Sequence, residues 1–193
     1  KNNMTEKGYR CLLAISSLDG LVEASQLSRM ISGVGNEVQS MLTRLLIEEY
    51  GAGRLQRKHS FYFSEMLVEL GMETEPETYF YSVPWQVLAN INHSFYLCDR
   101  NRHFLRYIGG LLYTETSVPY AFNNYSACAE RLNFAEKAKG YWDLHIKVDK
   151  MHGQWMLNDV AIPLIDNYKD FAWEMLLGYD QQKFISSRAG EAT

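Results

Sequence analysis

Several features that define common protein classes are missing from this chain. Its 193 residues include only three cysteines, Cys11, Cys98 and Cys128, which are too few and too far apart for a disulfide framework. No apolar run approaches the roughly 18 residues that a membrane span requires. No signal-peptide pattern opens the sequence. We therefore expect a cytoplasmic protein with no membrane partner.

An excess of positive charge is also absent. The chain carries 19 Lys and Arg against 23 Asp and Glu, a net charge of −4, which does not favour binding to nucleic acid. Its hydrophobic content of 47% is ordinary for a globular protein and supplies a substantial core. We expect a single domain over residues 1–193, with a core at about 20–180 and an unpacked tail at 186–193.

Proline and strand-like alternation are scarce, whereas apolar residues recur at helical spacing. The sequence therefore predicts an all-α fold with a loop at 72–84. The segment SGVG at 32–35 either ends the second helix or interrupts a longer one. Pro119 is expected to end or kink a helix. The predicted helices cover residues 5–18, 21–31, 36–49, 59–70, 85–113, 120–133, 134–159 and 163–180.

One short pattern concentrates groups that bind metals. His145, Asp149 and His152 are spaced i, i+4 and i+7, so a helix would place them on one face. Imidazole and carboxylate suit first-row metals such as iron. The alternative is a solvated polar stripe, but two of only five histidines fall in this pattern.

A single helix cannot close such a site, so other segments must contribute ligands. Glu49 ends one apolar helical stripe, and His59 opens the next. Glu115 is an isolated carboxylate in an otherwise uncharged stretch from 108 to 127, where burial without a partner would be costly. Glu23, in the segment Leu-Val-Glu-Ala, raises the same question.

The combination of Glu-x-Gly-x-Gly-x5-His, a lone Glu before Val-Pro, and His-x3-Asp-x2-His resembles the haem-oxygenase-like non-haem diiron oxidases and oxygenases. The resemblance covers residues from about 20 to 180. It implies a haem-oxygenase-like bundle of about seven helices. It also implies an iron-dependent enzyme that uses O2 as co-substrate.

Carried over position by position, the resemblance implies seven iron ligands. Glu115 would be the bridging and catalytic carboxylate, and Glu23 an additional ligand that only some members use. Two Fe(II) ions are expected, the second of them labile. The implied ligands are Glu23, Glu49, His59, Glu115, His145, Asp149 and His152.

The substrate expected from the resemblance is a small molecule such as an amino acid, a guanidine or amine, or a fatty acid. An external electron donor and a homodimer are both compatible with it. Three alternatives stay open at this point. The first is a metal-free or single-metal relative, such as a cofactorless oxidase. The second is a thiaminase-type hydrolase, which needs a catalytic cysteine in a pocket. The third is a non-enzymatic interaction protein.

Overall fold

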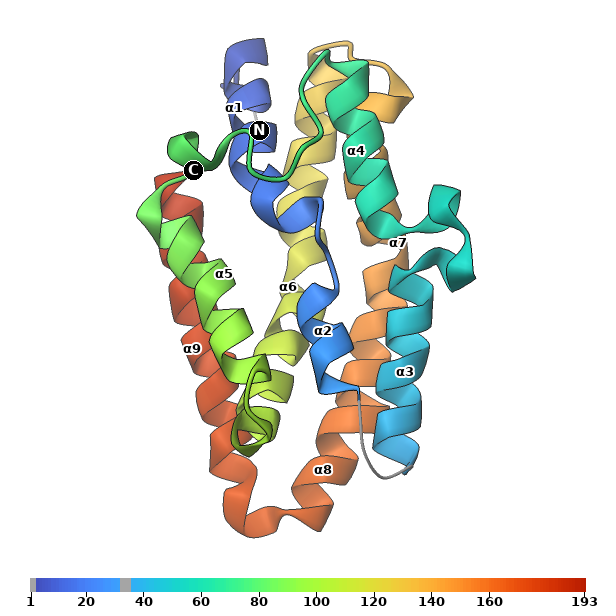
Figure 1. The fold of residues 1–193 in the computed structure, drawn as a ribbon, viewed down its shortest axis with the longest axis vertical. Coiled ribbons are helices and arrows are strands. Elements are labelled where there is room, and N and C mark those ends of the chain that lie inside the picture. Colours follow the sequence, from blue (N-terminus) through green and yellow to red (C-terminus); the bar gives the residue numbers. More distant parts are fainter. Residues whose placement is uncertain (1–2, 32–35) are drawn as a thin grey trace.

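A computed structural model describes residues 3–31 and 36–193, and this described part of the chain contains helices and no strands (Figure 1). The all-α bundle is therefore confirmed. Two short helices, α2 (Ser25–Met30) and α8 (Ile162–Asn167), accompany seven longer ones. The longer helices are α1 (Glu6–Gly20), α3 (Glu37–Glu49), α4 (His59–Glu69), α5 (Trp85–Cys98), α6 (Phe104–Arg131), α7 (Gly140–Trp155) and α9 (Ala172–Ala192).

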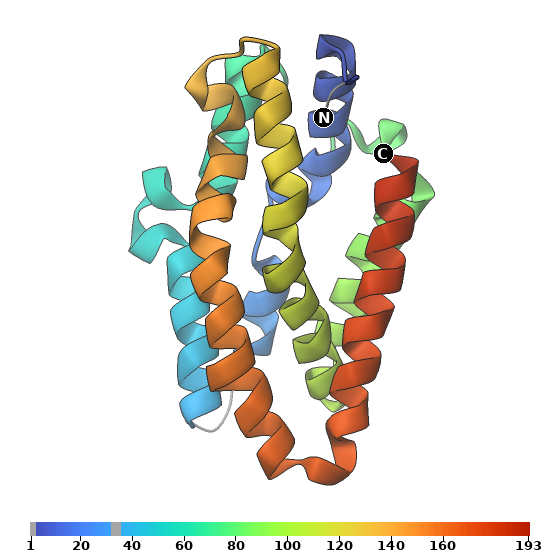
Figure 2. The ribbon, with the colours of Figure 1, turned by 180° about the vertical axis from the view of Figure 1, so that it is seen from behind.

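Helix α6 runs through the bundle and packs against both α7 and α9 (Figures 1 and 2). Two glycines allow α6 and α9 to approach closely. A Cβ added to Gly109 would lie 1.9 Å from the carbonyl oxygen of Met175, and one added to Gly178 would lie 1.9 Å from that of Arg106. Either side chain would force the helices apart. Helix α5 also packs on α9, and α4 packs on α7.

Two hydrophobic clusters fill the bundle, and a layer of polar side chains lies between them. One cluster includes Leu42 and Met156, and the other includes Phe63 and Trp142. Helix α7 contributes Trp142 to one cluster, and the chain that follows it contributes Met156 to the other. The residues between these two, including the predicted ligands of α7, therefore lie at the level where the clusters separate.

The helix predicted over 85–113 is interrupted, and the prediction that a helix ends at Pro119 is wrong. Helix α5 ends at Cys98, a 3-10 turn follows, and α6 then continues through Pro119 to Arg131. Proline lacks the N–H that would bond to the carbonyl four residues earlier, here that of Glu115. The helix nevertheless persists because α6 packs against neighbours on two sides.

The C-terminal third also differs from the sequence prediction. Helix α7 begins at Gly140 rather than 134 and continues into a π-helical segment, Met156–Ala161. The chain then breaks at 168–171, so the helix predicted over 163–180 becomes α8 and α9. The prediction of an unpacked tail at 186–193 is wrong, because α9 reaches Ala192 and buries Ala189. The segment at 32–35 lies outside the described residues.

The helices of the described residues include none that is both long and apolar enough to cross a membrane.

Candidate metal centre

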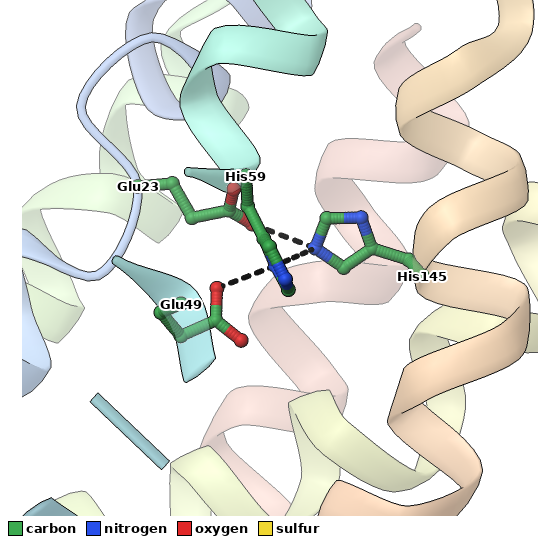
Figure 3. Close-up of side chains that lie close together, drawn as sticks. All are labelled: Glu23, Glu49, His59 and His145. Atoms are coloured by element: carbon green, nitrogen blue, oxygen red, sulfur yellow. Dashed lines mark hydrogen bonds and ion pairs between the residues drawn. The ribbon is translucent and has the colours of Figure 1, made fainter. Parts of the chain in front are cut away.

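The connection between α3 and α4 brings two predicted ligands together. Gly51 has a φ of +61°, and a Cβ added to it would lie 2.4 Å from the backbone carbon of Arg57, so only glycine fits this tight turn. The turn directs Glu49 and His59 toward each other. Glu49 Oε2 lies 2.7 Å from His59 Nδ1, and both side chains are buried (Figure 3).

Helix α7 orients His145 through its own backbone. The Nδ1 atom lies 2.9 Å from the carbonyl oxygen of Tyr141, one turn earlier, which fits an N–H donor at Nδ1. The Nε2 atom therefore points away from the helix, 3.2 Å from His59 Nδ1 and 3.0 Å from Glu23 Oε1. A hydrogen bond to the distal ring nitrogen is the usual way to fix a metal-binding imidazole.

Glu23 reaches this point from the turn that follows α1. The next residue, Ala24, adopts a left-handed conformation with a φ of 63°. Tyr141 donates a hydrogen bond of 2.7 Å to Glu23 Oε1 and holds the carboxylate in place. We call Glu23, Glu49, His59 and His145 site 1. One ligand-type atom from each of these four residues lies within 4.8 Å of the others (Figure 3).

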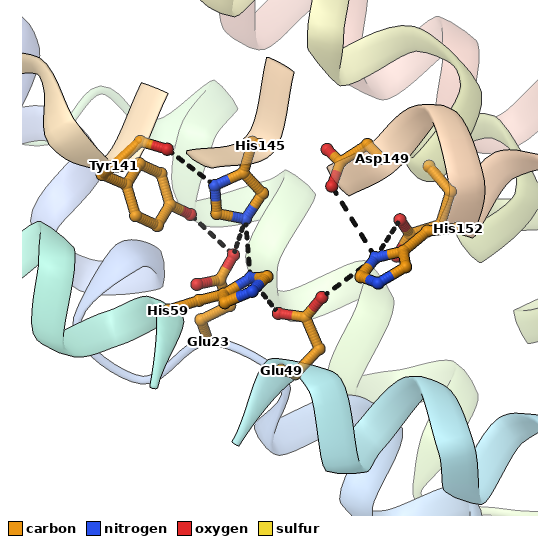
Figure 4. Close-up of polar contacts among 8 residues, drawn as sticks. Glu23, Glu49, His59, Tyr141, His145, Asp149 and His152 are labelled. Atoms are coloured by element: carbon orange, nitrogen blue, oxygen red, sulfur yellow. Dashed lines mark hydrogen bonds and ion pairs between the residues drawn. The ribbon is translucent and has the colours of Figure 1, made fainter. Parts of the chain in front are cut away.

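Glu49 also takes part in a second group. Its Oε1 atom lies 3.3 Å from His152 Nδ1, and Glu115 Oε2 lies 3.5 Å from the same nitrogen. We call Glu49, Glu115 and His152 site 2. Asp149 adjoins site 2, with its Oδ1 3.7 Å from His152 Nδ1 (Figure 4). Gly153 lets α7 approach α6, because a Cβ there would lie 3.2 Å from the Glu115 carbonyl oxygen.

All seven predicted side chains thus converge. The carboxylate that lies between the two sites is Glu49 and not Glu115. Glu115 was expected to bridge, yet it belongs to site 2 alone. Glu49 directs one oxygen toward His59 and the other toward His152. Its position at the end of α3, between the two sites, could not be read from sequence spacing.

The charges of site 1 compensate one another in the metal-free protein. Burial alone would raise the pKa of Glu49, but the neighbouring imidazoles of His152 and His59 outweigh burial and lower that pKa to about 2. Burial would lower the pKa of His145, but the neighbouring Glu23 carboxylate raises it to about 10. The proton on His145 therefore helps to hold the Glu23 carboxylate in place.

Site 2 and the adjoining Asp149 place three carboxyl groups around a single imidazole. Burial and the nearby Glu115 carboxylate raise the pKa of Asp149 to about 8. Burial likewise raises the pKa of Glu115, although the neighbouring His152 imidazole opposes this shift. Burial would lower the pKa of His152, but Glu115 and Glu49 raise it to about 10. Two acids thus share one imidazole at a distance where like charges repel.

The arrangement fits two metal ions of the first transition row. Several inward-facing polar atoms are buried without a hydrogen bond, among them Asp149 Oδ1, His152 Nδ1 and Glu23 Oε2. Such atoms are costly unless something binds them. A donor set of carboxylates and imidazoles suits iron, and the seven residues would hold it.

A cavity of about 540 Å³ opens onto this centre. The size lies within the range of small-molecule sites. Glu23, Glu115 and His145 line one part of the cavity, and apolar side chains from α1 and α6, such as Ile15 and Leu111, line another. A small molecule in the cavity would therefore lie directly beside the centre.

Sequence reasoning missed Tyr141. Tyr141 holds Glu23, and its place one turn before His145 was the available signal. Its neighbour Trp142 donates to the Tyr9 hydroxyl at 2.8 Å. Tyr113 packs edge-on against Tyr179. His93 and His103 lie outside both sites.

An all-α bundle with carboxylates and imidazoles gathered in two adjoining groups is the arrangement of a metal-binding protein. The chain belongs to the iron-containing redox enzyme family, whose profile matches residues 12–180. It is 30% identical over 176 residues to the nitrosourea synthase of Streptomyces achromogenes subsp. streptozoticus. That alignment covers 86% of this chain and 35% of the synthase, so the chain spans about a third of that relative.

Proposed function

We propose that this chain is an O2-activating non-haem diiron oxidase or oxygenase that acts on a small molecule. The position of Glu49 carries the proposal, because its two oxygens face two separate groups of ligand-type residues. Site 1 would hold one Fe(II), and site 2 with Asp149 would hold the other. Fe(II) in such a donor set keeps open positions and supplies the binding and reduction of O2.

The protein's own residues would perform three tasks. Tyr141 and the α7 backbone orient Glu23 and His145 before metal binds. Aromatic side chains around His145, namely the half-buried Phe122 and the buried Tyr141, keep bulk water from that face of the centre. The cavity positions a substrate beside the centre. The reducing equivalents would come from an external donor, and the setting would be the cytoplasm.

Two observations weigh against the alternatives. The three cysteines do not line the cavity, so a thiaminase-type nucleophile has no candidate there. A cofactorless oxidase or an interaction module has no need for four carboxylates, two of them buried, around three buried imidazoles. Such groups are costly to bury without a cation.

The proposal is tested by loading the purified chain with Fe(II) under anaerobic conditions. We expect up to two irons per chain and O2 consumption on exposure to air. The consumption should increase with the correct substrate in a screen of amino acids, guanidines, amines and fatty acids. A chain that retains no iron after desalting, or that consumes no more O2 than free Fe(II), would contradict the proposal.

A further inference from the structure

The connection between α3 and α4 carries a cluster of positive charge beside the metal centre. Residues 50–64 contain Arg54, Arg57 and Lys58 and no acid, although the chain as a whole has a net charge of −4. Arg54 and Arg57 are exposed, and Lys58 is half-buried. Two successive 3-10 turns form this segment, which projects from the side of the bundle (Figures 1 and 2). We call Arg54, Arg57 and Lys58 the basic loop.

The protein does not balance the charges of the basic loop. Among the described residues, no carboxylate forms an ion pair with any of its three cations, whereas Arg106, for example, contacts Glu174 at 2.6 Å. Glu48 is the one exposed acid in residues 44–64, and the charge of Arg44 offsets it. The basic loop therefore adds an uncompensated positive charge to one place on an acidic protein.

The segment that carries the basic loop begins and ends at residues of site 1. Glu49 precedes it and His59 follows it, and the two side chains lie 2.7 Å apart. The ends of the segment touch, since a Cβ on Gly51 would lie 2.4 Å from the backbone carbon of Arg57. His59 Nδ1 in turn lies 3.2 Å from His145 Nε2. A molecule docked on the basic loop would therefore lie directly outside site 1.

Aromatic rings line the short path from this surface to the centre. Lys58 Nζ lies 4.5 Å from the ring centre of Tyr50, which follows the last residue of α3. Arg44 Cζ, on α3, lies 4.0 Å from the ring centre of Trp155, and that ring centre lies 5.7 Å from the one of His152. Both aromatic residues are half-buried. Electrons pass fastest where the protein between two redox groups is thin, so this side of the bundle gives an electron donor close access to both sites.

The chemistry of the basic loop fits a transient partner with an acidic surface. Leu55 lies between the cations along the chain, is 62% exposed and offers an apolar contact. A few charges around one apolar side chain suit the small, charge-steered encounters of electron-transfer proteins. The proposed function requires reducing equivalents from outside the chain, so a donor must approach the centre from the surface.

We infer that the basic loop is the docking surface for an acidic one-electron donor protein of the iron–sulfur class. The inference deepens the proposed function and rests on it for the irons that receive the electrons. In each encounter one electron leaves the reduced cluster of the donor, which is thereby oxidised, and one Fe(III) of the centre becomes Fe(II). Two encounters return both irons to Fe(II), and no covalent bond forms or breaks between the two proteins.

The probe is a reduced plant-type 2Fe–2S ferredoxin with an acidic surface. It is mixed with protein that has been loaded with Fe(II) and then oxidised by O2, and stopped-flow absorbance follows the oxidation of its cluster. We expect the second-order rate constant to fall about tenfold or more between about 0.05 and 0.5 M salt, because salt screens the attraction between the two surfaces. Reduced methyl viologen, a small cation that needs no docking surface, should show no such decrease.

The triple variant Arg54→Gln, Arg57→Gln and Lys58→Gln should lower the rate constant with ferredoxin at low salt by about tenfold or more, and should not slow the reaction with reduced methyl viologen.

The matched control is Arg100→Gln, Arg102→Gln and Lys169→Gln. These three residues are exposed, lie in the connections before α6 and before α9, and adjoin no residue of either site in the chain. The control removes the same total charge and should lower the rate constant by less than about threefold. Equal rate constants for the two triple variants would overturn the inference.

Cross-linking of the metal-free protein to oxidised ferredoxin tests docking without iron. A zero-length carbodiimide reagent should join Lys58 to a ferredoxin carboxylate, as detected by mass spectrometry, and should not join Lys183, which is exposed on α9. Cross-links that avoid Lys58 would overturn the inference. Absence of bound iron in a wild type that still cross-links at Lys58 would instead refute the diiron proposal.

Discussion

Site 1 and site 2 share Glu49 but differ in how far the protein prepares them for metal. In site 1, Tyr141 holds Glu23 at 2.7 Å, and Glu49 contacts His59 at 2.7 Å. In site 2, the contacts to His152 Nδ1 are 3.3 and 3.5 Å, and that nitrogen has no hydrogen bond.

Site 1 is therefore preorganised for metal binding, whereas the acids of site 2 repel one another. Site 1 is held by hydrogen bonds that persist without metal, so binding there requires little rearrangement. Site 2 crowds Glu115 and Asp149 around one imidazole. Burial raises both pKa values, helped by the Glu115 carboxylate for Asp149 and by the Glu49 carboxylate for Glu115. Metal binding at site 2 must therefore displace protons from these acids and draw the ligands together. We expect site 1 to bind Fe(II) first and site 2 to bind the weaker, labile ion.

Replacing the shared carboxylate should have the largest effect. Glu49→Ala removes one ligand from each site and leaves the imidazoles of the two sites without the charge between them. We expect iron content near zero and no O2 consumption above that of free Fe(II). His103→Ala should keep both, because His103 lies outside the two sites. Normal iron content in Glu49→Ala would show that the sites are independent of this residue.

Replacing a ligand of one site should remove one ion. Glu115→Ala is expected to retain the iron of site 1 and lose that of site 2, which lowers the content from two irons to one. His59→Ala should damage site 1, and because site 2 is the weaker site, it should lower the total further. Metal analysis after desalting measures both variants. Equal iron content in the two variants would contradict the ranking of the sites.

The stability of the metal-free protein should fall as the pH rises from 6.5 to 9. The folded pKa values of His145 and His152, about 10, exceed the usual 6.5. Their stabilisation is full below pH 6.5 and is lost as the pH rises toward 10. The raised pKa of Asp149, about 8, acts in the same direction.

Thermal unfolding measures this pH effect. We expect a decrease of several degrees in Tm, since each kcal/mol shifts Tm by roughly 2–4 °C at this size. Fe(II) should reduce the decrease, because metal replaces the protons. Glu115→Gln should make the slope shallower, since Asp149 loses a charge that raises its pKa. A metal-free Tm that rises over this range would contradict the assigned charges.

The smallest effect concerns the hydrogen bond that orients site 1. Tyr141→Phe removes the donor to Glu23 and keeps the ring that packs against Phe63. Loss of such an orienting partner typically weakens metal binding by about tenfold. We expect the first Fe(II) affinity to drop and the second to change little. Tyr113→Phe is the control, and an equal drop in both variants would argue against the role of Tyr141.

Much of the candidate site could be predicted from the sequence, because several of its residues lie close together along the chain. The spacing of His145, Asp149 and His152 is fixed by the period of a helix. The turn at Gly51 fixes how Glu49 meets His59. The bridging role was assigned to Glu115, whereas the distances favour Glu49, and this choice depends on how α3 meets α6 and α7 in space. No local sequence pattern indicates how close these helices come to one another.

The fold class followed from helical periodicity, but the course of α6 through Pro119 and the C-terminal end of α9 did not. Pro119 disfavours a helix locally, yet α6 continues through it because packing against α7 and α9 outweighs the lost hydrogen bond. The tail is polar in sequence, yet α9 extends to Ala192 and buries Ala189. Tertiary contacts decided both segments.

The most direct test of the shared Glu49 is crystallography of protein loaded anaerobically with Fe(II), with data collected on both sides of the iron absorption edge. The account predicts two anomalous peaks, one at each site, with one oxygen of Glu49 bound to each iron. It also predicts lower occupancy at site 2. A single peak, or two irons with Glu49 bound to only one of them, would contradict the account.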